Sequence, residues 1–567
     1  MIYSKTLVAV VLVPSLAFAA QSTNNTLPVV DLGYARHQAA FYNSTGEFYN
    51  FSNIRYGAPP VGNLRWQLPQ PPASNRSVVE TGSQGRICSQ ASAAWLQVSG
   101  PFVQQYLAGQ TIFNASSFPI SSTSVPSIDP RETEDCLFLD VVVPKDILDT
   151  GDDGYGAPVL VWIHGGGYAL GSKTDSGGPS GLLARSRTGG RQGVIFVSLN
   201  YRLGAFGFLG GFDVQSNGTA NAGLYDQRLA LKWIQDNIHL FGGDPNRVTV
   251  FGESAGGGSI LAQITAFGGR QGRAPFAQAL LQSPAFEPYV SSQQQEQIAK
   301  TYLSNLNVST IDEARQLSYS DLYTANVMSL GSSEYGRFIF GPSVDGDLIP
   351  DVPGRLLARG LFDDNLRIMT AHNSEEGILF TSPFQQNNSE FEALVKRSLP
   401  DVTAFPEILS YLTETLYPPI FNDSSKTSYT SQVGRAALFN SELLFTCNAY
   451  YASKAFSKSA HSYLFSTSSG IHSADVPYSF YTGNGEPQPS AAASAFGGVI
   501  HPRTALVLQG YITEFALTGH PNSKSLPYLP RYGHNATMMV MNGTTFDLGA
   551  DPAANVRCDW LQQGRYY

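Results

Sequence analysis

The sequence has little charge and few cysteines, and each shortage excludes a class of protein. Only 14% of its 567 residues are Asp, Glu, Lys or Arg, against roughly 25% in ordinary soluble domains. The net charge is -9, which argues against nucleic acid or an anionic membrane surface as a partner. The four cysteines form no C-x-x-C pair. We therefore expect no metal site, no redox chemistry and no cofactor.

Long apolar runs are also missing beyond the N-terminus, so we expect no stable membrane anchor. The N-terminus itself has the pattern of a secretory signal peptide. Lys5 precedes the apolar stretch Leu7–Leu16, and Ala17-Phe18-Ala19 is a small-x-small cleavage site. We expect residues 1–19 to be removed and residues 20–567 to be secreted into the extracellular space.

Export has two covalent consequences that the sequence supports. Disulfides can form outside the cell, and the cysteines are even in number and widely spaced: Cys88, Cys136, Cys447 and Cys558. N-glycans are a candidate for keeping this weakly charged surface in water. An N-x-Ser/Thr triplet without proline begins at Asn24, Asn43, Asn50, Asn75, Asn114, Asn217, Asn307, Asn387, Asn422, Asn535 and Asn542.

The order of apolar segments predicts an α/β fold. Residues 159–163 and 194–199 are continuous apolar runs, as expected of strands that are covered on both faces. Residues 224–238 carry apolar side chains at helical spacing. Strands that alternate with helices predict a large, mostly parallel central sheet with helices on both faces. We expect one domain over residues 20–567, with loop-like insertions at 385–430 and 482–498.

The run Gly252-Glu253-Ser254-Ala255-Gly256-Gly257 is typical of a nucleophile elbow. It follows the apolar stretch 248–251 and precedes the helix-compatible stretch 258–262. A serine between glycines at this junction is held out of the sheet on a tight turn, above the positive end of the next helix. Ser254 is therefore the candidate nucleophile.

A serine alcohol needs a base, and the base needs an orienting acid. In α/β-hydrolases these follow the serine in the order acid, then histidine. Glu375 and Glu376 compete for the acid position in the loop after the strand-like stretch 366–370, and we choose Glu376. His472 follows an alternating strand within a short loop, which is the setting expected of the base. The other histidines beyond Glu376 are His461, His501, His520 and His534.

Attack on an ester carbonyl creates an oxyanion, which needs N–H donors that already point at it. The run His164-Gly165-Gly166-Gly167 directly follows the strand 159–163 and fits a glycine-rich oxyanion loop. The N–H of Ala255, directly after the candidate nucleophile, is a further donor.

These motifs together resemble the type-B carboxylesterase family, which includes cholinesterases and the large fungal lipases. The residues that carry the resemblance are Ala58–Gly62 with Arg65, Glu134–Leu139, His164–Gly167, Asn200–Arg202, Asn221–Gln227, Phe241–Pro245 and the elbow. The resemblance implies the α/β-hydrolase fold and carboxylic-ester hydrolysis through an acyl-enzyme. It implies the triad Ser254, Glu376 and His472, with Gly166, Gly167 and Ala255 as oxyanion donors. It further implies a disulfide-closed loop at Cys88–Cys136, a second pair Cys447–Cys558, and an ion pair between Arg65 and Glu134.

The substrate clues in the sequence point in two directions. Phe338 and Phe340 lie two apart in what we expect to be a strand, so both would face one side and narrow an acyl pocket. This favours short to medium acyl chains. A helix-like apolar cluster between Trp95 and Leu107 fits equally well a buried loop or a lid that opens on long-chain or emulsified esters. Cholinesterases carry a tryptophan shortly before the cysteine that matches Cys136, but residues 125–131 contain no aromatic side chain, which argues against choline esters. The remaining alternative is a non-catalytic extracellular binding module on the same fold.

Overall fold

The structure is a computed structural model that describes residues 27–110, 113, 125–151, 154–287, 292–467, 469–483 and 500–566. The expected signal peptide at 1–19 lies outside these residues. So do Asn24, Asn114 and most of the expected insertion at 482–498.

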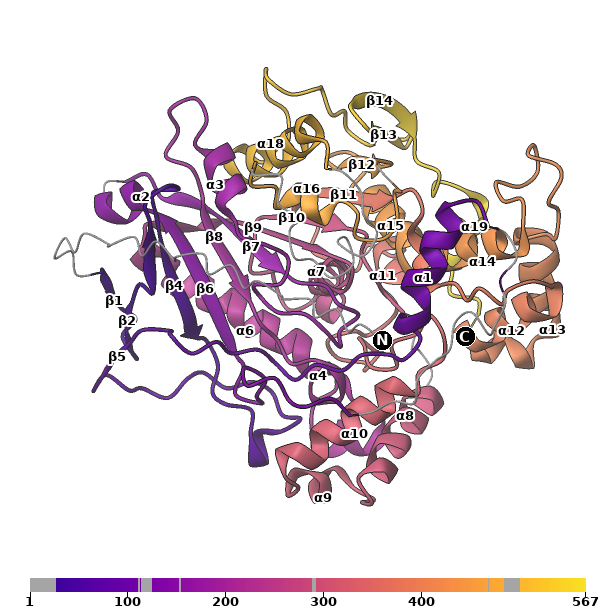
Figure 1. Cartoon of the computed structure of the whole chain (residues 1–567), viewed down its shortest axis with the longest axis horizontal. Coiled ribbons are helices and arrows are strands. Elements are labelled where there is room, and N and C mark those ends of the chain that lie inside the picture. The colour runs from indigo at the N-terminus through magenta and orange to yellow at the C-terminus, as the bar shows by residue number, and fades with distance from the viewer. Residues whose placement is uncertain are drawn as a thin grey trace, which may run out of the picture.

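Within the described residues, one sheet of eleven strands forms the centre of the molecule (Figure 1). Its strands run in the order β14-β13-β12-β11-β10-β9-β7-β8-β6-β4-β3. Their bounds are β3 Phe41–Asn43, β4 Phe48–Arg55, β6 Phe138–Pro144, β7 Ala157–Ile163, β8 Ile195–Leu199, β9 Gly243–Glu253, β10 Gln278–Gln282, β11 Arg367–Asn373, β12 His461–Phe465, β13 Thr537–Asn542 and β14 Thr545–Ala550.

The run from β8 to β13 is parallel, and antiparallel strands flank it at both edges. Both faces of β7 are buried, since Val159 and Val161 belong to one apolar cluster and Leu160 and Trp162 to another. A continuous apolar run is what such a doubly covered strand requires. The mostly parallel sheet predicted from the sequence is confirmed.

Helices cover the two faces of this sheet (Figure 1). α6 Ala222–Asn237 and α7 Ala255–Ile264 contribute to the cluster on one face. α18 Pro502–Thr518 and α3 Ser180–Ser186 contribute to the cluster on the other. The further helices are α2 Lys145–Thr150, α4 Gly204–Phe208, α5 Phe212–Asn217, α8 Ser292–Asn305, α9 Ile311–Arg315, α10 Tyr319–Gly331, α11 Pro353–Ala358, α14 Gln432–Ser441, α15 Cys447–Ala455, α16 Val476–Ser479 and α19 Val556–Gln562.

The N-terminal part forms a small sheet and a disulfide-closed loop. β1 Val29–Asp31, β2 Arg36–Gln38 and β5 Val79–Glu80 make the sheet. The disulfide Cys88–Cys136 closes the loop that carries α1 Leu96–Leu107. Beside it, Arg65 Nε lies 2.6 Å from Glu134 Oε1, and both side chains are buried. The disulfide and the ion pair implied by the family resemblance are both present.

The segment 385–430 is a correction to the sequence analysis, because much of it is helical rather than loop-like. It contains α12 Asn388–Ser398, α13 Pro406–Ser410 and the short helices η6 Pro400–Ala404 and η7 Tyr411–Leu416. The Asn387 side chain caps α12 by accepting from Glu390 N, and the helix buries a short apolar face. Because many residues of α12 are polar, the sequence pattern did not indicate this apolar face.

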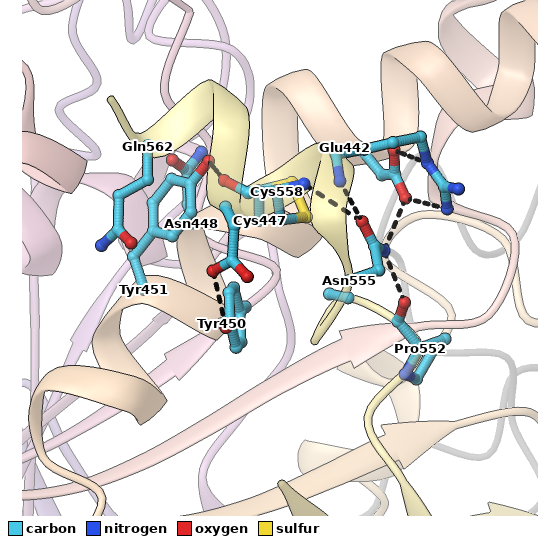
Figure 2. Close-up of a disulfide and its surroundings, with 12 residues drawn as sticks. Glu442, Cys447, Asn448, Tyr450, Tyr451, Pro552, Asn555, Cys558 and Gln562 are labelled. Carbon is cyan, nitrogen blue, oxygen red and sulfur yellow. Dashed lines mark hydrogen bonds and ion pairs between the residues drawn. A yellow bond between two sulfur atoms is a disulfide. The ribbon is translucent and has the colours of Figure 1, made fainter. Parts of the chain in front are cut away.

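The C-terminal helix is fastened to the interior by several bonds (Figure 2). A disulfide joins Cys447, at the start of α15, to Cys558 in α19. Next to it, Glu442 Oε1 lies 2.7 Å from Arg557 Nη2 and accepts from Asn555 Nδ2 at 3.0 Å. Both implied disulfides are thus present, and the second anchors the last helix of the chain.

We expect the double substitution Cys447→Ala, Cys558→Ala to lower the free energy of unfolding by about 2–4 kcal/mol, because it removes a cross-link across a long loop. Chemical denaturation measures this change. Lys454→Ala is the matched control, since it removes the half-exposed Lys454–Asp559 ion pair between the same two helices and should cost less than about 1 kcal/mol. Equal losses for the two variants would contradict the anchoring role.

Candidate active site

Ser254 occupies the turn between β9 and α7, as the glycine pattern predicts. Its backbone has φ 58° and ψ -121°, a conformation that is costly for a non-glycine residue. The turn is held from both sides, because Ser254 N donates to Gln282 O at 3.1 Å and Ser254 O accepts from Gly258 N at 2.9 Å. The surrounding backbone therefore fixes the hydroxyl at the end of the sheet.

The glycines beside Ser254 are required by the end of β7. A Cβ atom at Gly252 would lie 2.6 Å from the carbonyl oxygen of Ile163, and one at Gly256 would lie 2.0 Å from the same oxygen. These are backbone atoms, so no rotamer change relieves the clash. The turn and the strand can pack this closely only without side chains at both positions.

The loops after β11 and β12 bring Glu376 and His472 together. Glu375 N donates to Gly470 O at 2.7 Å, which ties one loop to the other. Glu376 is fully buried, and its Oε2 lies 2.5 Å from His472 Nδ1. Glu375, in contrast, is exposed. Of the two competing carboxylates, only Glu376 contacts the histidine.

Glu376 is held as a carboxylate in spite of its burial. Burial alone raises the pKa of Glu376, but the charge and hydrogen bond of His472 outweigh it and bring that pKa below its usual value. Ser283 Oγ donates to Glu376 Oε1 at 2.6 Å, and Asn373 N donates to the same oxygen at 2.5 Å. Hydrogen bonds to the charged form act in the same direction.

His472 is held between carboxylates. Burial opposes its charge, but Glu253 and Glu376 outweigh burial and raise the pKa of His472 above its ordinary value. Glu253 Oε1 lies 3.3 Å from His472 Nε2 and accepts from Ser473 Oγ at 2.7 Å. Burial raises the pKa of Glu253 itself to about 8. Among the described residues, His472 Nε2 has no hydrogen-bond partner.

The glycine-rich loop after β7 lies beside Ser254 and His472. Gly166 and Gly167 have φ values of 108° and 62°, in the region that favours glycine. Ala255 is the first residue of α7, and the first N–H groups of a helix have no acceptor within the helix. His164, before the glycines, hydrogen-bonds the carbonyl oxygen of Gly165 through Nδ1 at 2.8 Å.

Two cavities meet at Ser254. The larger has a volume of about 440 Å³, and its lining includes Ser254, His472, Glu253 and the three glycines of the loop. The smaller has a volume of about 40 Å³ and is lined mainly by aromatic and aliphatic side chains. All the expected triad and oxyanion residues except the buried Glu376 and Ala255 therefore border one space.

The backbone that carries Phe338 and Phe340 differs from the sequence-based expectation. Residues 337–340 form a bend rather than the expected strand. Both phenylalanines nevertheless line the smaller cavity beside Ser254. Phe338 packs against Trp95 at 5.4 Å between ring centroids, and Phe340 packs against Tyr302 at 6.1 Å. Aromatic packing, and not a strand pairing, directs the two rings.

The apolar cluster between Trp95 and Leu107 forms α1. Trp95, Val98, Phe102 and Val103 are buried, whereas Leu107 is 43% exposed. Leu96, Ser99 and Gly100 line the larger cavity. α1 is thus a packed wall of that cavity, with an apolar tip at the surface.

The remaining histidines beyond Glu376 lie away from His472. His461 begins β12 and bonds the carbonyl oxygen of Pro530 at 2.9 Å through Nδ1, at the opposite end of that strand. His501 directly precedes α18, and His520 lies just after that helix ends. His534 lies in the turn before β13.

Several residues around the site were not anticipated from the sequence. Glu253 is the last residue of β9, and Ser283 directly follows β10. Functional residues of parallel sheets gather at the carboxyl ends of the strands, so this rule could have identified both. Phe445 and Phe380 pack on His472, with ring centroids at 4.2 Å and 5.2 Å. Phe445 belongs to the short helix η8 Glu442–Thr446, and no local pattern marks it.

Within the described residues, no group of three or more His, Cys, Asp or Glu side chains is arranged to hold a metal ion. In the same part of the chain, no helix combines the length and the apolarity needed to cross a membrane.

Comparison with known proteins decides the family. The model of the carboxylesterase family matches residues 30–554. The chain belongs to the carboxylesterase family. It is 41% identical over 554 residues to a carboxylesterase, patB, of Penicillium expansum, covering 95% of this chain and 96% of that one. It is 40% identical over 550 residues to patB of Aspergillus clavatus, with 95% and 96% covered. The enzyme is therefore a carboxylic ester hydrolase.

Solved structures confirm the fold class. The crystal structure of EstA from Aspergillus niger superposes with a TM-score of 0.75, covers 95% of this chain and 99% of its own, and is 23% identical in sequence. The carboxylesterase has the α/β-hydrolase fold that the sequence predicts.

We expect Gly256→Ala to lower the free energy of unfolding by about 3 kcal/mol, because its Cβ has no room beside Ile163. Thermal and chemical unfolding measure the loss. Gly178→Ala is the control, since no atom lies within 4 Å of a Cβ there and its backbone has no positive φ. If Gly256→Ala were as stable as Gly178→Ala, the close packing of the turn on β7 would be wrong.

Proposed function

We propose that this carboxylesterase hydrolyses its ester through an acyl-enzyme on Ser254. His472 is the general base and Glu376 orients it. The contact that carries the proposal is the 2.5 Å approach of His472 Nδ1 to Glu376 Oε2. It leaves Nε2 without a hydrogen-bond partner among the described residues, on a histidine that lines the same cavity as Ser254.

The reaction takes two steps. His472 Nε2 accepts the hydroxyl proton as Ser254 Oγ attacks the ester carbonyl, and the imidazolium then gives that proton to the leaving alcohol. Water attacks the acyl-enzyme in the second step, again with His472 as base, and releases the acid and the free serine. Glu376 holds the imidazole by Nδ1 and stabilises its charged form in both steps.

The oxyanion of each tetrahedral intermediate is proposed to bind the N–H groups of Gly166, Gly167 and Ala255. The positive φ of both glycines supports this role, because it lets successive amides turn to one side. The position of Ala255 at the start of α7 adds the positive end of a helix. Losing one such donor typically costs about 10²–10³ in turnover.

We further propose that the acyl group enters the smaller cavity, with short to medium chains favoured. Its volume of about 40 Å³ and the rings of Phe338 and Phe340 support this assignment. A second candidate is a lipase for long-chain or emulsified esters, which the apolar wall of α1 and its exposed Leu107 favour. Comparing soluble with emulsified esters, from acetyl to oleoyl, separates the two.

The cellular setting is part of the same proposal. Residues 1–19 act as a signal peptide, and residues 20–567 form one secreted, N-glycosylated domain. Two disulfides support an oxidising environment.

Ser254→Ala should reduce kcat for p-nitrophenyl esters by about 10⁴-fold or more, because no other group forms the acyl-enzyme. Initial-rate assays with thermal unfolding of the same preparations measure this. Ser525→Ala, at an exposed serine after α18, should leave both quantities unchanged. A Ser254→Ala enzyme that keeps a tenth of its activity would refute Ser254 as the nucleophile, whereas an unmodified protein without esterase activity would favour the binding-module alternative.

On the acidic side of the pH profile, the midpoint of the fall in kcat/KM should lie above pH 6.5, which is the ordinary pKa of histidine. His472 must be neutral to accept a proton, and its pKa is raised, so activity falls as the pH drops through that pKa. Glu253→Gln removes a carboxylate that raises this pKa and should move the midpoint to lower pH. A midpoint that stays in place in Glu253→Gln would show that Glu253 does not act on His472.

A further inference from the structure

The smaller cavity beside Ser254 is mainly apolar, and one charged residue stands among the residues that line it. Five of its lining residues are phenylalanines, and Leu444, Ala285 and Pro342 add aliphatic surface. Glu287 also lines it. A carboxylate in such a pocket requires a reason, because buried charge is costly unless it is paired.

Glu287 is paired with Arg337. The Arg337 Nε atom lies 2.6 Å from Glu287 Oε1, and the two side chains are only 11% and 15% exposed. Glu287 Oε2 also accepts from Phe338 N at 3.3 Å. The ion pair therefore joins the segment after β10, which carries Phe286, to the bend that carries Phe338 and Phe340.

We propose that the Glu287–Arg337 ion pair sets the length of the acyl chain that the enzyme accepts. The substrates are then esters of short-chain carboxylic acids, and a longer acyl group is accepted only when it ends in a hydroxyl. This inference rests on the acyl-enzyme at Ser254 and on the smaller cavity as the acyl side.

The size of the cavity sets where the limit falls. A site for one water needs about 10–15 Å³, so about 40 Å³ holds roughly three water-sized groups. An acyl group of about four carbons, counting the carbonyl, fills that space. Because Glu287 is part of the wall of that space, we place further methylenes against the ion pair.

Contact with the ion pair penalises an aliphatic chain end. A methylene displaces water from the charged groups and returns no hydrogen bond, so the desolvation cost is not recovered. A terminal hydroxyl both donates and accepts hydrogen bonds, so it can replace the displaced water. A site whose polar groups bind a substrate hydroxyl strongly disfavours the analogue that lacks this hydroxyl.

The test is the double variant Glu287→Leu, Arg337→Met. Both charges are removed together, because removing one partner leaves an uncompensated buried charge, whereas an apolar pair of similar volume is often tolerated. The kcat/KM value is measured for p-nitrophenyl esters from acetyl to octanoyl. We expect the ratio of octanoate to butanoate to rise about tenfold over the unmodified enzyme.

A second readout separates polarity from size. Each ω-hydroxy acyl ester is compared with the aliphatic ester that has the same number of heavy atoms. The unmodified enzyme should prefer the hydroxylated ester once the chain exceeds about four carbons, and the double variant should lose that preference. A pair that only braces Phe338 would change the length profile but leave the hydroxyl preference in place, and that result would overturn the proposal.

Three further variants complete the experiment. Glu392→Leu, Lys396→Met makes similar changes at an exposed pair in α12 and should match the unmodified enzyme. Phe338→Ala, Phe340→Ala should admit long chains and keep the hydroxyl preference. Glu287→Gln, Arg337→Gln removes both charges but keeps polar side chains, and it should raise the octanoate ratio by a smaller factor, so it replaces the first double variant if that variant does not fold.

Failure of the proposal is distinct from failure of the acyl-enzyme mechanism. Labelling of Ser254 by a dialkyl p-nitrophenyl phosphate, which transfers its dialkylphosphoryl group to the serine and releases p-nitrophenolate, is followed by mass spectrometry and tests the nucleophile independently of chain length. Labelled, active variants with the length profile of the unmodified enzyme would overturn the role of the ion pair alone. An unlabelled Ser254 would overturn the mechanism itself.

Discussion

The active site depends on one close approach between two segments of backbone. The Ser254 turn packs on the carbonyl oxygen of Ile163 at the end of β7, where no side chain fits at Gly252 or Gly256. The oxyanion loop begins directly after Ile163, and a Cβ at Gly165 would lie 2.7 Å from Glu253 O. Because the two segments touch through main-chain atoms, the proposed nucleophile and the proposed donors keep one relative position. Side-chain packing alone would leave that position adjustable.

A second constraint is the burial of charge around His472. Glu376, Glu253 and His472 all lie out of water. Glu376 and His472 stabilise each other's charged forms, and Ser283, Ser473 and the backbone donate hydrogen bonds to the two carboxyl groups. In a medium of low dielectric these interactions are stronger than in water, and an unpaired member would be costly. The cluster therefore supports a histidine whose proton affinity is set by its neighbours.

The sequence predicted the features that depend on local pattern. Glycine spacing identified the Ser254 turn, and continuous apolar runs identified the parallel strands. The order of loops after strands identified Glu376 and His472 as the expected acid and base, and the family resemblance implied the same roles. Three features depend on tertiary contacts and were missed or misread. The polar segment 385–430 forms helices because packing covers a short apolar face. Aromatic contacts direct Phe338 and Phe340 without a strand. Phe445 reaches His472 from a distant helix.

The anchoring of the last helix has a consequence for how the enzyme matures. Phe445, which packs on His472, lies two residues before Cys447, and Glu442 lies three residues before Phe445. Both Cys447 and Glu442 are bound by residues of α19, near the end of the chain. The two cysteines are 111 residues apart in the sequence. A growing polypeptide therefore lacks these partners until α19 has been synthesised, and the cross-link behind the wall beside the histidine forms only when the two cysteines are oxidised.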